Sequence, residues 1–246
     1  MTTPYLTLHH ASCTDILPTL EANSVEMVLT DIPYDEVNRT SSGLRELDKG
    51  IADDITFDLG FAIREAIRVA KGSVYIFCGI EQVSEIRKQM VGKGLSTRLC
   101  IWEKTNPSPM NGDKLWLSGV ECCVFGRKPN ATFNRHCKNT VFRFPSGQSK
   151  RHPTEKPVPL LEELITASTN EGDTVLDFTM GSGSTGEACL KHKRKFIGVE
   201  LDENYFLLAR DRLEEYQASR IDLPVQEVEV EKGKPVSLFD FIGGSR

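Results

Sequence analysis

The sequence predicts an α/β protein with a buried sheet that is covered by helices. Short apolar runs alternate with amphipathic segments along most of the chain, which is typical of this fold class. A glycine-rich turn joins one apolar run to the amphipathic segment that follows it, as expected of a strand–turn–helix unit. With 246 residues, of which 39% are hydrophobic, the chain can form one large domain or two small ones.

The first half of the chain contains an alternating series of predicted strands and helices. Residues 25–30 are an apolar run that ends at Asp31, so we expect a buried strand there. Residues 57–70 carry apolar side chains at helical spacing until Lys71-Gly72 ends the pattern. The other elements expected here are strands at 73–78, 95–103 and 119–126 and a helix at 81–91. The polar stretch 35–56 has a length that is usual for binding loops and lids.

The second half repeats the alternation and ends in an acidic tail. We expect helices at 158–168, 184–191 and 203–216, and strands at 174–179 and 196–201, because apolar runs and helical spacing alternate there too. Acids prevail after about residue 220, which is usual for a solvated segment. We therefore predict a single domain over 1–220 and a separate tail over 221–246.

Composition and charge exclude several classes of protein. The 30 Lys and Arg residues against 35 Asp and Glu give a net charge of −5, which argues against a protein that coats nucleic acid but leaves room for a local basic patch. No run approaches the roughly 18 apolar residues of a membrane span, and the first residues lack the regions of a secretory signal. The seven cysteines are scattered without a C-x-x-C pair. We therefore expect no disulfide framework, no metal site and a cytoplasmic location.

The turn over 177–186 predicts a nucleoside-containing cofactor. Gly181, Gly183 and Gly186 satisfy G-x-G-x-x-G, and Glu200 ends the next predicted strand, 19 residues after Gly181. Glycines allow a ligand to approach the backbone closely, and a carboxylate at that strand end can accept hydrogen bonds from ribose hydroxyls. Sites for NAD, FAD and S-adenosyl-L-methionine (SAM) share this geometry, and a glycine turn without any ligand has the same pattern.

The position of Asp177 favours SAM among these cofactors. Its carboxylate lies four residues before the first glycine, where it would repel a pyrophosphate but attract an ammonium group. SAM carries an ammonium and a sulfonium cation, and NAD carries neither of these groups.

The tetrapeptide Asp31-Ile32-Pro33-Tyr34 follows a predicted strand, where sheets of this class bind ligands. The exocyclic amine of a nucleobase is a poor nucleophile because its lone pair is delocalised into the ring. Two acceptors against its two N–H bonds, namely the Asp31 carboxylate and the Ile32 carbonyl, would direct the lone pair at a methyl donor. Pro33 would fix that carbonyl, and the ring of Tyr34 could stack on a base flipped out of a duplex. A strand end with a proline turn and a buried tyrosine is the alternative interpretation.

Five blocks in this order resemble the DNA amino-methyltransferases of the β-group, in which the catalytic motif precedes the SAM loop. They are Asp31-Ile32-Pro33-Tyr34, Trp102-Glu103-Lys104-Thr105-Asn106-Pro107, His152-Pro153-Thr154-Glu155-Lys156-Pro157, the loop 177–185 and Gly198-Val199-Glu200-Leu201. The resemblance covers most of residues 5–216. It implies a Rossmann-like fold, with a seven-stranded, mostly parallel sheet and helices on both faces, and SAM as the cofactor.

The resemblance also implies roles for individual residues. Asp31, the backbone of Ile32, Pro33 and Tyr34 would form the base site. The cofactor would be surrounded by Asp177, Phe178, Gly181, Ser182, Gly183, Thr185, Glu200, Thr154 and Lys156. The tripeptide Ala11-Ser12-Cys13 stands where the family often has Gly-Asp before the first helix, and Ser12 and Cys13 are included as candidates for an adenine contact. Ile32 replaces the family's first Pro, and Thr179-Met180 replaces a more usual pair of small residues.

A basic, aromatic segment over about 127–151 lies where this family inserts its target-recognition region. No acid occurs between Glu121 and Glu155. The candidate DNA-binding residues are Arg127, Lys128, Arg135, Lys138, Arg143, Lys150 and Arg151. Basic groups neutralise phosphates, and the interleaved Phe133, Phe142 or Phe144 could stack on bases or wedge between them. A solvated loop whose phenylalanines anchor it to the core is the alternative.

The sequence therefore predicts a DNA methyltransferase that uses SAM and acts on the exocyclic amine of a flipped base in double-stranded DNA. Adenine N6 is favoured because the family's cytosine-N4 members typically carry Ser where this chain has Asp31. A cytosine-N4 methyltransferase is the alternative within the class. A nucleotide-dependent oxidoreductase and a DNA-binding module without catalysis are the alternatives outside it. The short recognition segment would fit a homodimer.

Overall fold

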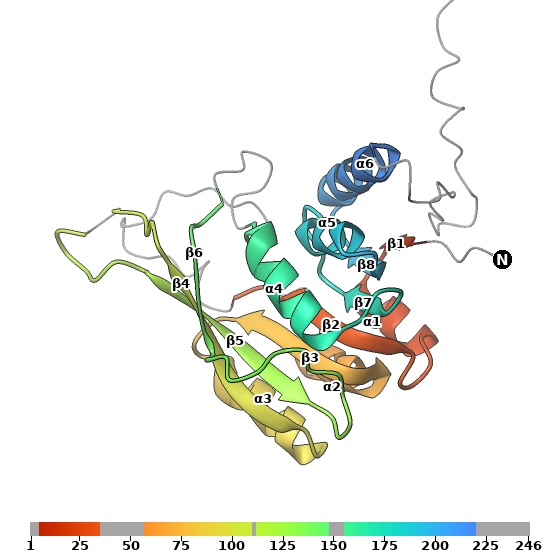
Figure 1. Cartoon of the computed structure of the whole chain (residues 1–246), viewed down its shortest axis with the longest axis horizontal. Coiled ribbons are helices and arrows are strands. Elements are labelled where there is room, and N and C mark those ends of the chain that lie inside the picture. Colours follow the sequence, from red (N-terminus) through yellow and green to blue (C-terminus); the bar gives the residue numbers. More distant parts are fainter. Residues whose placement is uncertain (1–4, 35–56, 110–111, 148–154, 220–246) are drawn as a thin grey trace, which may run out of the picture.

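A central sheet of eight strands organises the chain. The computed structural model describes residues 5–34, 57–109, 112–147 and 155–219. The strands are β1 Leu6–His10, β2 Val25–Asp31, β3 Ala70–Cys78, β4 Ser96–Lys104, β5 Val120–Arg127, β6 Val141–Phe144, β7 Thr174–Asp177 and β8 Lys195–Glu200. Their order in the sheet is β1-β8-β7-β2-β3-β5-β4-β6 (Figure 1). Two strands that are far apart in the sequence, β2 and β7, are therefore neighbours at its centre.

One strand runs against all the others. Parallel pairing links β1 to β8, β8 to β7, β7 to β2, β2 to β3 and β4 to β6, whereas β5 is antiparallel to both of its neighbours, β3 and β4. The carboxyl ends of seven strands and the amino end of β5 consequently share one edge of the sheet, which we call the carboxyl edge. We call the opposite one the amino edge. Sheets of this kind bind ligands at the carboxyl edge.

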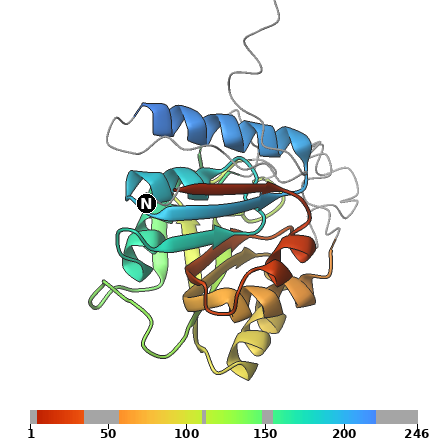
Figure 2. The same cartoon turned by 90° about the vertical axis from the view of Figure 1, so that its right-hand side faces the viewer.

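Helices cover both faces of the sheet, as Figure 2 shows in a view along its edge. The helices are α1 Cys13–Ile16, the short 3-10 helix η1 Leu17–Thr19, α2 Leu59–Val69, α3 Val83–Gly92, α4 Val158–Ser168, α5 Ser184–Lys191 and α6 Glu203–Ala218. The buried side chains of α4, α5 and α6 share one hydrophobic cluster, and those of α1, α2 and α3 share a second. The first three helices along the chain thus cover one face, and the last three cover the other.

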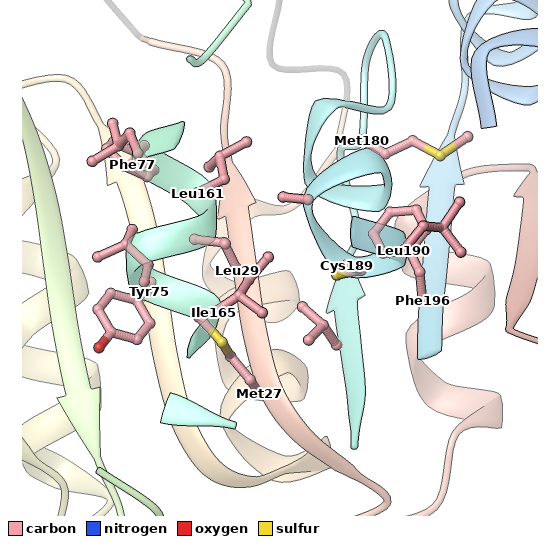
Figure 3. Close-up of a cluster of buried hydrophobic side chains, with 14 of the residues drawn as sticks. Met27, Leu29, Tyr75, Phe77, Leu161, Ile165, Met180, Cys189, Leu190 and Phe196 are labelled. Atoms are coloured by element: carbon pink, nitrogen blue, oxygen red, sulfur yellow. The ribbon is translucent and has the colours of Figure 1, made fainter. Parts of the chain in front are cut away.

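Alternation along the central strands supplies both clusters. Met27 and Leu29 of β2 face the helix layer of α4, together with Leu161 and Ile165 from that helix (Figure 3). Val28, between them in sequence, points to the opposite face and belongs to the cluster of α2 and α3. Because side chains of a strand point alternately to its two faces, a strand that is apolar at every position must be covered on both sides.

Capping residues in the sequence set where several helices begin. The Asp58 side chain accepts a hydrogen bond from Phe61 N at 2.9 Å and starts α2. Asp202 accepts from Asn204 N at 2.9 Å and Tyr205 N at 3.0 Å and starts α6. These side chains satisfy amide groups that the first turn of a helix leaves without a partner.

The predicted elements are confirmed, with differences of a few residues at their ends, but the sheet has eight strands instead of seven. The two strands that the sequence analysis missed, β1 and β6, lie at the two edges of the sheet. Each is short, and β6 lies inside the segment 127–151 that was predicted as an insertion. The strand β6 pairs with β4, so this part of the segment belongs to the sheet.

Two predicted segments lie outside the described residues, namely the polar stretch 35–56 and the tail 221–246. Across the residues that the structure describes, no helix is both long enough and apolar enough to cross a bilayer. In the same residues, no group of three or more His, Cys, Asp or Glu side chains could hold a metal ion.

Candidate active site

The tetrapeptide that follows β2 is fixed at the carboxyl edge by contacts to β3 and the turn after it. Asp31 is the last residue of β2, and Ile32 N donates to Phe77 O at 3.2 Å. The Gln82 side chain donates from Nε2 to Pro33 O at 2.9 Å and accepts at Oε1 from Gly79 N at 2.8 Å. Gln82 is therefore a clamp that holds the backbone of the tetrapeptide, and the sequence analysis did not identify it.

The Asp31 carboxylate belongs to a network of charged side chains from four different segments. Lys156, just before α4, forms an ion pair with Asp31 Oδ2, and its Nζ lies 2.9 Å from Glu121 Oε2. Lys104 Nζ lies 2.8 Å from Glu121 Oε1. The Tyr34 hydroxyl lies 3.0 Å from Asp31 Oδ1 and 3.1 Å from Glu121 Oε2, so it has a carboxylate acceptor on either side.

Burial and charge act on the pKa values of this network in opposite directions. Burial raises the pKa of Asp31, and the charge of Lys156 only partly opposes this effect. Burial also acts to raise the pKa of Glu121, but Lys156 and Lys104 outweigh it and hold that pKa at about 2. The pKa of Lys156 is raised, because Asp31 and Glu121 outweigh the effect of its burial. Lys156 is thus a buried cation with two anionic partners.

The structure places Lys156 beside Asp31 and Tyr34, and its contact with a cofactor stays a prediction. Its side chain is 5% exposed, and its Nζ lies 5.4 Å from the centre of the Tyr34 ring and 5.3 Å from that of Phe77. Thr154, the other candidate from the same block, lies outside the described residues. The neighbouring Glu155 pairs with Arg212 of α6 at 2.7 Å.

The Asp177 carboxylate is buried and bonded to the protein itself. Oδ1 accepts from Thr30 Oγ1 at 2.8 Å and from Thr179 N at 3.2 Å, and Oδ2 accepts from Thr185 Oγ1 at 2.7 Å. Burial raises its pKa to about 7, although these hydrogen bonds oppose the rise. Asp177 therefore ties together the ends of β2 and β7 and the start of α5. Its contact with the ammonium group of a cofactor stays a prediction.

The glycine turn and Glu200 meet at the carboxyl edge, as the sequence predicts. Glu200 Oε2 accepts from Gly181 N, and Oε1 accepts from Asp202 N, both at 2.9 Å. Gly183 has a φ of +77° and lies against Ala209 of α6, so a side chain there would be strained. A Cβ on Gly186 would lie 2.8 Å from Leu213 Cδ1, which shows that the third glycine is required by helix packing.

The remaining cofactor candidates surround this turn, and several are buried. Ser12 caps α1 and Cys13 begins it, directly after the end of β1 and beside β8. Phe178 is fully buried in the cluster of α2 and α3. Ser182 is held by Arg212 Nη1, which donates to its carbonyl at 3.2 Å. Contacts within the protein therefore hold this turn against α6.

The residues present fit a nucleoside ligand with a ribose. The Glu200 carboxylate is oriented by two backbone amides, and each of its oxygens keeps a lone pair that can accept from a ribose hydroxyl. Gly181 brings backbone without a side chain of its own next to this carboxylate. Both features lie on the same edge as Asp31. The glycine turn follows β7, the neighbour of β2, and Glu200 ends β8 on the far side of β7.

The basic candidates are divided between the two edges of the sheet. The Lys128 ammonium donates to Asn23 Oδ1 at 2.9 Å and to Ala70 O, and Arg127 donates to Ala131 O at 2.6 Å. Arg135 pairs with Glu163 of α4 at 3.2 Å. Because β5 is antiparallel, its last residue lies at the amino edge, so the structure does not bring these three residues to the edge that carries Asp31.

Arg143 is the described basic candidate near the carboxyl edge. It lies on β6 opposite Glu103, pairs with that residue at 3.0 Å and is 71% exposed. Lys138 is exposed and precedes β6, while Lys150 and Arg151 lie outside the described residues. The predicted set of seven residues is therefore not assembled into one surface by the part of the chain that the structure describes.

The aromatic residues of the basic segment lie in different environments. Phe142 and Phe144 are partly buried and pack against the hydrophobic cluster of α4, as the alternative interpretation of the segment expects. They alternate with Val141 and Arg143, which point to the other face of β6. Phe133 is partly exposed, with its ring centre 6.4 Å from that of Phe125 of β5. The fully exposed aromatic residue is Trp116, in the loop between β4 and β5 at the carboxyl edge.

Glu121 is a second functional candidate, besides Gln82, that was not predicted from the sequence. In the sequence it only marks the start of the basic segment, and an acid at a strand end is common. Its place opposite Trp102 in the β4–β5 pair turns it toward α4 and Lys156. The signal in the sequence is an isolated acid at the start of an apolar run. It points to the site only once the antiparallel pairing of β5 is known.

Comparisons with known proteins agree with this geometry. A model of a family described as DNA methylase matches residues 132–211. Type II methyltransferase M2.DpnII of Streptococcus pneumoniae is 30% identical, over 87% of this chain and 93% of its own length. DNA adenine methyltransferase YhdJ of Escherichia coli K12 is 28% identical, over 85% and 82%. The crystal structure of the M1.HpyAVI–SAM complex superposes with a TM-score of 0.67 at 28% identity, over 85% of this chain and 98% of that one.

Proposed function

Because the chain belongs to the DNA methylase family of amino-methyltransferases, we propose that it methylates the N6 amine of adenine in double-stranded DNA with SAM as the methyl donor. The observation that carries the proposal is the position of Asp31. An acid ends the central strand β2, with a proline turn and Tyr34 after it, and the glycine turn follows the neighbouring strand β7. A site for an amine and a site for a nucleoside cofactor are thus adjacent.

Asp31 and the backbone of Ile32 would prepare the amine for attack. One N–H would donate to the Asp31 carboxylate and the other to the Ile32 carbonyl, which favours a pyramidal nitrogen with a directed lone pair. The clamp by Gln82 on Pro33 O fixes the direction of this turn. Once the nitrogen carries the methyl group it must lose one proton, for which the Asp31 carboxylate is the nearest base.

The cofactor would be held by the glycine turn and Glu200. When bound, SAM supplies a methyl group on a positively charged sulfur. Glu200 would accept hydrogen bonds from the ribose, and the turn at Gly181 and Gly183 would lie along the ligand. Asp177 keeps this turn attached to β2 through Thr30.

The double-stranded form of the DNA and the formation of a homodimer are further parts of the proposal. One relative named above is a DNA adenine methyltransferase, and a base that is methylated at its exocyclic amine must leave the stack of a duplex. On the carboxyl edge, exposed Trp116 and Arg143 are the groups best placed to meet DNA. A cytoplasmic location stays a prediction from the sequence.

Incubation with unmethylated plasmid DNA and methyl-labelled SAM tests the proposed function. We expect label in the DNA, and sequencing that detects modified bases should find N6-methyladenine within a short common motif. Methylcytosine in place of methyladenine would overturn the choice of base. The absence of label, together with a change in nicotinamide absorbance on addition of NAD and a reductant, would overturn the reaction class.

Arg143 is expected to contribute to phosphate binding. The Arg143→Gln variant should bind duplexes of all sequences more weakly and should flatten the plot of log affinity against log salt by about 0.9 per lost phosphate contact. Lys71→Gln serves as a control, because Lys71 is also well exposed but lies near the amino edge beside Glu26. Fluorescence anisotropy at several salt concentrations measures both slopes. A slope equal to that of the wild type in Arg143→Gln would remove this residue from the DNA surface.

A further inference from the structure

Glu121 has no part in the proposed roles of Asp31 and Ile32, yet it is at the centre of the charged network. It is the second residue of β5, and its carboxylate contacts Lys104, Lys156 and Tyr34. Its side chain is 18% exposed. A second carboxylate next to a catalytic one raises the cost of ionising both, so its presence calls for a physical explanation.

Lys156 needs a counter-ion that is not Asp31. Its ammonium is buried and bonded to Asp31 Oδ2, which is one of the two oxygens that could accept the substrate amine. With Asp31 as its sole anionic partner, Lys156 would compete with the amine for that carboxylate. Glu121 Oε2 at 2.9 Å offers the ammonium a second anion, so the interaction with Asp31 can weaken without leaving a buried charge unpaired.

The Tyr34 hydroxyl, like the Lys156 ammonium, can interact with either Asp31 or Glu121. It has one proton and two carboxylate acceptors, Asp31 Oδ1 at 3.0 Å and Glu121 Oε2 at 3.1 Å. When it donates to Glu121, Oδ1 of Asp31 is free to accept an N–H group from the substrate. When it donates to Asp31, that oxygen is occupied. Without a carboxylate at position 121, Asp31 is the remaining carboxylate that can accept the hydrogen bond from the Tyr34 hydroxyl.

We propose that Glu121 is a positioning residue for methyl transfer, which draws the Lys156 ammonium and the Tyr34 proton toward itself so that Asp31 is available to the substrate amine. This inference rests on the proposed function and concerns the same site. It assigns Glu121 no contact with the substrate or the cofactor.

The charges around Asp31 predict how the pH profile responds. The titratable groups that interact electrostatically with Asp31 are Lys156 before α4, Glu121 and Cys123 on β5, Cys78 on β3, Asp177 on β7 and Tyr34 after β2, and Lys104 of β4 pairs with Glu121. Glu121 raises the pKa of Asp31 and Lys156 lowers it. Removing the charge of Glu121 therefore lowers the pKa of Asp31, and removing that of Lys156 raises it.

The experiment measures kcat and the pH dependence of kcat/KM for the wild type, Glu121→Gln, Lys156→Met and the double variant, on one duplex that contains the target site. Glu121→Gln should reduce kcat roughly 10- to 100-fold, with unchanged affinity for SAM by calorimetry. The acidic limb should move to lower pH in Glu121→Gln and to higher pH in Lys156→Met. The double variant should have a limb between the two.

Glu65→Gln is the matched control. Glu65 of α2 is 17% exposed and pairs with Arg68 at 2.7 Å, so its neutralisation resembles that of Glu121 in burial and loss of an ion pair. Glu121→Asp adds a variant that keeps the charge and should keep the acidic limb near its wild-type position while kcat falls. It also serves if the Gln variant does not fold, which circular dichroism would reveal.

The outcomes separate the two proposals. A wild-type enzyme that transfers no methyl group to DNA would overturn the proposed function. A wild type that transfers, with a Glu121→Gln variant that matches Glu65→Gln in kcat and in its acidic limb, would overturn the inference alone. A limb that moves to higher pH in Glu121→Gln would overturn it as well.

Discussion

Replacing Asp31 by alanine is expected to reduce the rate of methyl transfer by about 10²- to 10³-fold, the loss seen when one preorganised polar group is removed from an active site. The amine would lose a charged acceptor at the moment when its nitrogen becomes positive. The backbone acceptor at Ile32 would stay, because Gln82 and Phe77 hold that turn. Single-turnover measurement with labelled SAM and excess enzyme isolates this step.

Affinity for SAM is the control for this substitution. Asp31 contacts Lys156 and Tyr34, whereas Glu200 lies on β8, two strands away. We therefore expect Asp31→Ala to bind SAM with the affinity of the wild type. Asp31→Asn keeps one oxygen acceptor without its charge and should lie between the two. Full activity in the alanine variant would refute the proposed role of the tetrapeptide.

Replacing Glu200 by alanine is expected to weaken the binding of SAM by about 100-fold or more. Each hydrogen bond to a charged group contributes about 1.5–3 kcal/mol, and two ribose hydroxyls would lose their acceptor. The turn would also loosen, since Gly181 N and Asp202 N would lose the carboxylate that now joins them. Titration calorimetry with SAM measures the change.

Glu203→Ala is a suitable comparison for this variant. Glu203 is exposed in the first turn of α6, close in sequence to Glu200. Its removal should leave the affinity for SAM unchanged. If Glu200→Ala folds, as shown by its thermal unfolding, and still binds SAM as the wild type does, the ribose contact proposed for Glu200 is incorrect.

The parts of the fold and site that depend on local pattern can be predicted from the sequence. The apolar run before Asp31 predicts β2, and the glycines before α5 predict the turn that Glu200 anchors. Such features can be predicted because strand alternation and turn chemistry are written in adjacent residues. The order of blocks along the chain then carried the resemblance to the family.

The direction and pairing of strands could not be predicted in this way. The apolar run of β5 is the same whether the strand is parallel or antiparallel, yet its direction decides that Glu121 lies at the carboxyl edge and Arg127 at the other. Similarly, the composition of the basic segment suggests a loop, whereas the alternation of Phe142 and Phe144 with exposed residues builds β6. Contacts between distant segments decide these outcomes.

Thr179 connects the two halves of the site by hydrogen bonds to the ends of β2 and β7. Its hydroxyl donates to the Asp31 carbonyl at 3.0 Å, and its amide donates to Asp177. A ligand that restrains the glycine turn would therefore also restrain the end of β2, where the proposed function places the flipped base. By thermodynamic linkage, if bound cofactor increases the affinity for DNA, bound DNA increases the affinity for the cofactor by the same factor. The site would thus retain SAM and DNA together and release both after the methyl group has been transferred.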